Sequence, residues 1–264
     1  MVMEGDLQNL VLKCEDSLEG IFTGIYEAYA LRVPLDTVMI ETGNQDNLRL
    51  FTTYQTIQPD SNKATKVVLT LQERLGEEDY HTLCMALSSP APDKAQAVFR
   101  TVAWGLKEKK CRSIMEHLTD DHIRRVLELS RGAGNELQHL KGFLRFQELE
   151  NDILFSTIHP ANDLLPLLAL HFADRLPKED FVILDAGRKL YVVHPSGKEW
   201  FMMKDNLGEA NLSEIPITAE EEYYQELFRH FCHSISIEAR ENLKLQRNML
   251  PIHFRKYMVE FTKS

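Results

Sequence analysis

At 264 residues and 44% hydrophobic composition, the chain is long enough to fold as one large globular domain or as two small ones. Its formal net charge of −10 argues against a protein that coats nucleic acid by bulk charge, although residues 236–264 hold six basic and three acidic side chains. No apolar run approaches membrane-spanning length, and the first residues lack a basic and then apolar leader pattern, so we expect a cytoplasmic protein without membrane contact.

The first half of the chain predicts an α/β opening followed by helices. Residues 7–14 favour a strand, Asp16 and Ser17 offer an N-cap for a helix that Pro34 ends, and residues 49–57 alternate as a second strand would. The helices that follow are predicted over residues 61–75, 78–88, 92–109 and 120–140, with caps at Asp60–Ser61 for the first and Thr119–Asp120 for the last. Gly132 and Gly134 predict a kink or a break in the last of them.

The second half predicts a small sheet between helices. Its strands are expected over residues 143–149, 153–158, 181–184, 189–193 and 199–203, and its helices over 162–176, 219–235, 238–247 and 251–261. The fold class is therefore α+β, mostly helical, with a small mixed or antiparallel sheet and C-terminal helices. We place a domain boundary between residues 1–90 and 91–264, with a single domain as the alternative.

The cysteine pattern gives no sign of a disulfide framework or a metal site. Cys14, Cys84, Cys111 and Cys232 lie far apart and form no CxxC pair, so we expect reduced thiols. Glu136 and His139 have the ExxH spacing of di-metal bundles, which Glu78 and His81 repeat, but the matching carboxylates that such a site also needs do not appear. We therefore predict no metal and no cofactor.

The helix predicted over residues 162–176, with Asn162 or Asp163 as its cap, carries ionisable residues on neighbouring faces. His171 lies three residues before Asp174 and four before Arg175, a spacing that brings the three side chains close on a helix. They could bind phosphate or do acid–base chemistry, but spacing alone favours a solvated, salt-bridged face.

A second candidate lies near the C-terminus. Arg240, Lys244 and Arg247 follow an i, i+4, i+7 pattern that would form one basic stripe on a helix, with Gln246 beside it and Arg255 on the next helix. Such side chains suit a phosphate backbone, although a solvated face is the commoner outcome.

Several segments together resemble a bacterial group of DNA-metabolism proteins. They are GFLRF (142–146), HPANDLLPLLALHFADRLP (159–177), ILDAGRK (183–189) and EARENLKLQRNMLPIHFRKYMVEF (238–261), and YEAYA (26–30) is similar to the stand-alone members. The resemblance covers nearly the whole chain. It implies a context of DNA repair or modification, a domain also found fused behind uracil-DNA-glycosylase-like domains, and a radical-SAM protein as partner.

The resemblance and the local charge together give three hypotheses. The first is a DNA-binding accessory protein, whose expected nucleic-acid contacts are Arg145, Arg175, Arg188, Arg240, Lys244, Gln246, Arg247 and Arg255. The second is an enzyme acting on a damaged or modified base, with His139 or His171 as acid–base group and Asp163 or Asp185 as its partner. The third is a protein–protein adaptor without DNA contact, for which a large exposed apolar patch would be the sign.

Overall fold

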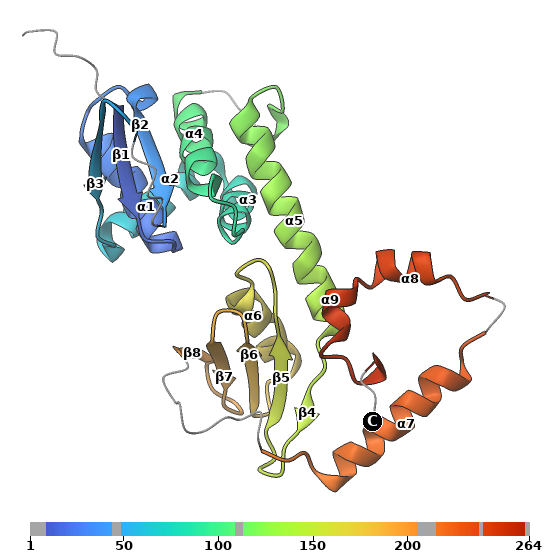
Figure 1. Cartoon of the computed structure of the whole chain (residues 1–264). Helices are drawn as coiled ribbons and strands as arrows, with labels where there is room; N and C mark the ends of the chain where they lie inside the picture. Colours follow the sequence, from blue (N-terminus) through green and yellow to red (C-terminus); the bar gives the residue numbers. More distant parts are fainter. Residues whose placement is uncertain (1–8, 44–48, 109–112, 205–214, 238–239, 262–264) are drawn as a thin grey trace, which may run out of the picture. The chain divides into compact units, whose positions relative to one another are not determined.

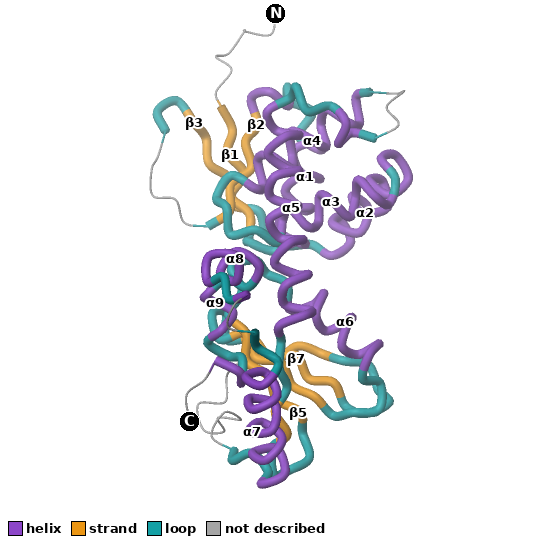
Figure 2. Tube along the Cα trace, turned by 90° about the vertical axis from the view of Figure 1, so that its right-hand side faces the viewer, coloured by secondary structure: helices purple, strands orange, loops and turns teal. Residues whose placement is uncertain are grey.

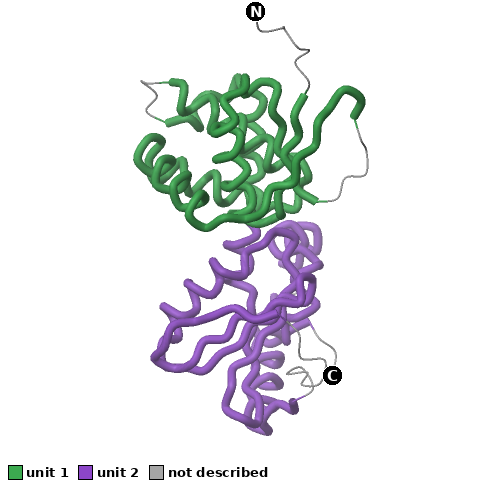
Figure 3. Tube along the Cα trace, turned by 90° about the vertical axis from the view of Figure 1, so that its left-hand side faces the viewer, with its two compact units in different colours: residues 1–134 green, residues 135–264 purple. Residues whose placement is uncertain are grey.

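The chain folds as two compact units in a computed structural model that describes residues 9–43, 49–108, 113–204, 215–237 and 240–261. Figure 3 colours the units, residues 1–134 and 135–264. Each unit combines helices with a sheet of its own, which confirms the α+β class. The units divide after Gly134, because helix α4 (Lys94–Lys107) and the start of helix α5 (Asp121–Phe143) contribute to the core of unit 1.

Unit 1 is built on a three-stranded parallel sheet in the order β2-β1-β3 (Figure 1). The strands are β1 (Asn9–Cys14), β2 (Val38–Thr42) and β3 (Thr52–Thr56), and the helices besides α4 are α1 (Leu18–Ala30), α2 (Ser61–Leu75), α3 (Glu77–Leu87), and the 3-10 helices η1 (Leu35–Thr37) and η2 (Ile114–Glu116). The middle strand is fully buried at Val11 and Leu12. Leu12 joins Ile25, Leu71 and Phe99 in one hydrophobic core, so the helices pack around this central strand.

Local signals placed the helices of unit 1 correctly. Ser17, Asp60 and Asp120 accept hydrogen bonds from backbone N–H groups in the first turns of α1, α2 and α5. The predicted break in α5 is wrong, since the helix continues through Gly132 and Gly134 to Phe143. Strand β2 was not predicted, because its five residues follow a proline turn and do not alternate in polarity.

Unit 2 contains a mixed five-stranded sheet in the order β4-β5-β6-β7-β8. Its strands are β4 (Gln147–Glu148), β5 (Leu154–Ile158), β6 (Phe181–Asp185), β7 (Leu190–His194) and β8 (Phe201–Lys204). Strands β5 and β6 are parallel and joined through helix α6 (Leu165–Arg175), while the other pairs are antiparallel. Phe146 lies between Phe172 of α6 and Phe181 of β6, with ring centroids 5.2 and 5.6 Å away, and so ties the helix to the sheet.

The C-terminal segment of unit 2 is helical. It contains α7 (Ala219–Ser234), α8 (Leu243–Met249), α9 (Ile252–Arg255) and the 3-10 helix η5 (Val259–Phe261). Figures 1 and 2 show α9 beside the last turns of α5, where Phe254 meets His139 and Phe143 at ring-centroid distances of 5.5 and 5.7 Å. Within the described ranges, no helix combines the length and apolar character that crossing a bilayer requires.

Candidate functional site

The loop between β5 and α6 is held by a buried carboxylate of α5. Glu136 accepts hydrogen bonds from the backbone N–H groups of Ala161 and Asn162, each at 2.9 Å, and from the Asn162 side-chain amide at 2.6 Å. The prediction that Asn162 or Asp163 caps α6 is wrong for Asn162, whose side chain is used here, and α6 has no side-chain cap. Glu136 is therefore a loop-binding residue, and its ExxH spacing to His139 is incidental.

A second carboxylate fixes the same loop from the turn between β6 and β7. Asp185, which is 0% exposed, accepts hydrogen bonds from the N–H groups of Gly187 (2.9 Å) and Arg188 (3.1 Å) and from the Arg188 guanidinium (3.0 Å). That guanidinium also donates to the carbonyls of Pro160 at 3.1 Å and Ala161 at 2.8 Å. The family-like ILDAGRK turn is thus a clamp on the loop that precedes α6, and both Asp185 and Arg188 serve it.

Two other predicted phosphate ligands bind the C-terminal segment of the same unit. Arg145 pairs with Glu260 at 2.8 Å and donates to the carbonyl of Gly142 at 2.9 Å. Arg255 donates to the carbonyl of Leu250 at 3.0 and 3.2 Å and lies over the ring of Phe261 at 4.8 Å from its centroid. These guanidinium groups use part of their five N–H donors to hold the C-terminal segment of unit 2 in place.

His139 lies in an aromatic cluster. Its ring stacks on Phe143 and meets Phe254 edge-on, both at 5.5 Å between centroids. A neighbouring cavity, whose lining includes Arg145, His159 and Tyr257, has a volume of only about 20 Å³. That is room for about one water molecule, far less than a flipped nucleobase needs.

The other predicted catalytic residues have different surroundings. His171 lies half-buried against Phe172, with ring centroids 4.9 Å apart. Burial, and then the positive charges of Lys141 and Arg175, lower the pKa of His171 below its ordinary value. Asp163 is exposed in the loop before α6. The hydrogen bonds of Asp185 go to its own turn and to Arg188, so the paired acid–base roles of these residues stay predictions.

The remaining predicted nucleic-acid contacts are exposed. They are Arg175, Arg240, Lys244, Gln246 and Arg247. The prediction of one basic helix stripe is wrong, because Asn242 caps α8 by accepting the N–H of Leu245 at 2.9 Å, so that Arg240 lies before the helix that carries Lys244 and Arg247. Across the part of the chain that the structure describes, the side chains of Arg240, Lys244 and Arg247 have no hydrogen bond or ion pair.

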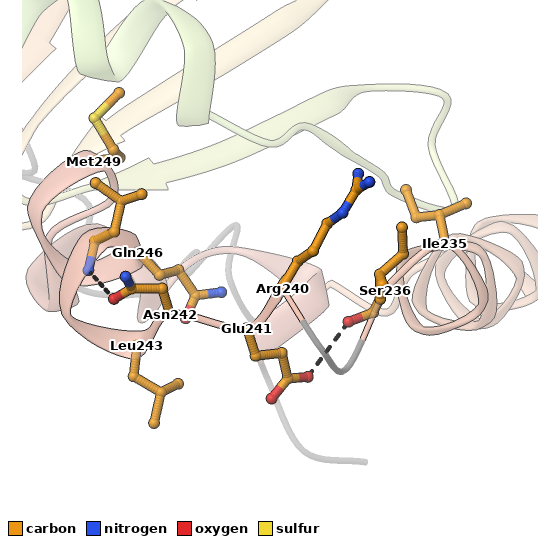
Figure 4. A pocket seen from close by; sticks show the side chains of 10 residues that line it. Ile235, Ser236, Arg240, Glu241, Asn242, Leu243, Gln246 and Met249 are labelled. Carbon is orange, nitrogen blue, oxygen red and sulfur yellow. Dashed lines mark hydrogen bonds between the residues drawn. The ribbon is translucent and has the colours of Figure 1, made fainter.

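An open hollow adjoins this basic segment. It has a volume of about 570 Å³, and Figure 4 shows Arg240, Leu243 and Met249 among the side chains that line it. Ser236 and Glu241 also line it, and the Ser236 hydroxyl donates a hydrogen bond to Glu241 at 3.4 Å. The hollow combines apolar and basic surface on the outside of unit 2.

Potential metal ligands are scattered. In the described ranges, no three His, Cys, Asp or Glu side chains converge as metal ligands do. Cys14, Cys84 and Cys232 are free thiols, while Cys111 lies outside the described residues.

Unit 2 is thus an α+β unit in which two buried carboxylates, Glu136 and Asp185, hold the loop before α6. Asp185 does so through the guanidinium of Arg188. The chain belongs to the family described as a domain of unknown function, DUF4130, whose model matches residues 92–260. No curated protein matches the sequence.

A comparison with solved structures gives a distant likeness. One chain, described as a DHH domain of a member of a family of ribosomal proteins, is 11% identical. The match covers 72% of this chain and 74% of that chain at a TM-score of 0.34, which carries no argument about function.

Proposed function

We propose that this protein is an accessory protein of DNA repair or modification that binds DNA through Arg240, Lys244 and Arg247. The observation that supports this proposal is that all three basic side chains are exposed and, among the described residues, unpaired. They lie within eight positions of one another on a chain whose net charge is −10, so they form a local positive surface on an acidic body.

Phosphate contacts of this kind position a duplex or a single strand without reading its sequence. Arginine can contact a phosphate with two parallel hydrogen bonds, whereas lysine acts as a point charge. Gln246 offers an amide on the same helix as Lys244, and Arg175 is a further exposed cation of unit 2. Arg145, Arg188 and Arg255 have structural contacts, and we assign them to supporting the surface.

The salt dependence of DNA binding tests this proposal. The double variant Arg240→Glu/Arg247→Glu is compared with Lys178→Glu/Lys198→Glu, which changes the net charge equally at two other exposed positions of unit 2. With fluorescently labelled DNA between about 50 and 200 mM salt, the slope of log K against log salt should flatten by about 1.8 in the first variant only. Equal slopes and affinities for the wild type and both variants would contradict the proposal.

Protein–protein contact is a second candidate function, favoured by a row of exposed apolar side chains on α7. The resemblance to DNA-metabolism proteins supports a radical-SAM protein as partner, and the spread of the four cysteines here means that such a partner would supply its own cluster. Co-expression and co-purification of the two proteins tests this. Base chemistry at His139 has no comparable support, because the cavity next to its aromatic cluster is too small for a nucleobase.

A further inference from the structure

A small hollow in unit 2 is lined by polar side chains from three separate segments. Arg145 lies shortly after α5, and His159 lies directly after β5. His253 belongs to α9, and Tyr257 lies in the turn that follows it. The rest of the lining is apolar apart from Thr157. Because these segments are distant in the sequence, only the fold brings the four polar groups to one place.

The polar groups of this hollow have hydrogen-bonding capacity left. The rings of His159 and His253 and the hydroxyl of Tyr257 have no hydrogen bond to another residue within the described ranges. Both histidines are exposed. The bonds that hold Arg145 use its two terminal nitrogens, so its Nε–H stays available. The hollow therefore presents several unpaired donors to solvent.

His159 lies on a loop that other parts of unit 2 hold in place. Glu136 and Arg188 bind the three residues that follow it. Gly187 leaves room for its ring, since a Cβ there would lie 3.2 Å from His159 Cε1. Strand β5 runs parallel to β6, and the ligands of parallel sheets bind at the carboxyl ends of the strands, where His159 lies. A residue on a fixed loop also loses little conformational freedom when it binds a ligand.

The charge and the size of the hollow favour an anionic oxygen as its occupant. Among the described residues, its lining contains no Asp or Glu. Glu260 pairs with Arg145 but lies outside the lining, and Lys256 adds a positive charge 5.0 Å from the ring centroid of Tyr257. The volume of about 20 Å³ admits one oxygen atom and excludes a base or a sugar. A tetrahedral oxyanion can place one oxygen in the hollow and leave the others at the donors around it.

We propose that the hollow formed by Arg145, His159, His253 and Tyr257 is a binding site for a terminal phosphate group. A terminal phosphate carries three strong acceptor oxygens and close to two negative charges, so it can use several separate donors at once. The end of a phosphorylated strand and a free nucleotide share this group. The site does not include the basic residues of the proposed DNA surface and does not depend on them.

Titration of the full chain with inorganic phosphate tests the site directly. The ring signals of His159 and His253 in NMR spectra should shift with a dissociation constant on the order of millimolar, as expected for one small anion at an open site. Sodium chloride of equal ionic strength should leave both rings unchanged. Tyr257→Phe removes only a hydroxyl and should weaken phosphate binding about threefold or more.

Two oligonucleotides of one sequence, with a 5′-phosphate or a 5′-hydroxyl, test the strand end as the source of the phosphate. The phosphorylated strand should bind about tenfold more tightly, because it gains a charge-assisted hydrogen bond. His159→Gln/His253→Gln should abolish this preference. The matched control, His122→Gln/His230→Gln, changes two histidines that are also exposed but lie outside the lining, and it should keep the preference.

The same comparison separates this site from the proposed DNA surface. In Arg240→Glu/Arg247→Glu both strands should bind more weakly, while the preference for the phosphorylated one remains. Shifts of both rings with inorganic phosphate, without any preference between the strands, would assign the site to a free phosphate compound. The proposal is overturned if phosphate moves the two rings no more than chloride does. It is equally overturned if His159→Gln/His253→Gln binds phosphate as the wild type does.

Discussion

Removal of the Asp185 carboxylate should destabilise unit 2 more than removal of any exposed acid. Asp185→Ala deletes the acceptor for the N–H groups of Gly187 and Arg188 and for the Arg188 guanidinium. The guanidinium would then keep only its bonds to the carbonyls of Pro160 and Ala161. The clamp on the loop before α6 would lose its anchor in the sheet.

The expected size of the effect follows from the burial of the pair. Breaking a buried ion pair by removing one partner costs about 3–5 kcal/mol. The Arg188 side chain is 27% exposed, so solvent screening places the loss near the lower limit, at about 3 kcal/mol. Asp185→Asn keeps an oxygen for the backbone donors and should cost about half as much.

The two tryptophans allow each unit to be followed separately, because Trp104 lies in unit 1 and Trp200 in unit 2. In a Trp104→Phe background, urea unfolding followed by fluorescence of Trp200 should show a midpoint about 1–2 M lower for Asp185→Ala. Asp174→Ala, at an exposed position of α6, should leave the midpoint within about 0.3 M. The same small shift for both variants would refute the clamp.

Three further outcomes follow from particular residues. Gly24→Ala should lower the stability of unit 1 by about 1–3 kcal/mol, because an added Cβ would collide with Cys14 Sγ. Gly132→Ala meets open space and should raise the stability by about 0.5–1 kcal/mol. The melting midpoints of the two variants, measured by thermal unfolding, should therefore move in opposite directions. Burial followed by the charge of Lys141 lowers the pKa of His171 below 6.5, so the unfolded chain binds a proton first and stability should fall as pH drops below about 6.5. A titration of the His171 ring by NMR at or above 6.5 would contradict this, and Lys141→Gln should move its pKa upward. Burial raises the pKa of Cys14 to about 12, so this thiol should resist alkylation at pH 8 until the chain unfolds, as peptide mass spectrometry can show.

The sequence located elements whose signals are local. Ser17, Asp60 and Asp120 were readable as N-caps because a cap needs only its own side chain and the next three backbone N–H groups. Strand β2 has no such signal, since its five residues do not alternate in polarity. The start of the predicted helix over 238–247 was misplaced, because Asn242 caps α8 and so begins the helix after Arg240. Periodicity of basic residues alone would join Arg240 to that helix. Residues 238–239 lie outside the described part.

The residues of the candidate site also differ in how far the sequence alone could predict their roles. The sequence grouped the ionisable side chains of the family-like segments as equals. The structure separates the eight predicted nucleic-acid contacts into two groups. Arg145, Arg188 and Arg255 bind loops or the C-terminal segment of unit 2, and the other five face solvent. Glu136 and Glu260, which bind the loop and Arg145, were missed as supporting residues, because a carboxylate acquires such a role only from a partner distant in sequence.

The sequence by itself determined the α+β class, most of the helices and the local excess of positive charge near the C-terminus, because composition, periodicity and caps act over one or two turns. Only the tertiary structure decided which cations remain available to a ligand and which side of α7 is left uncovered. Both depend on what each side chain meets after residues from different parts of the chain have packed together, and that information is not carried by any single segment.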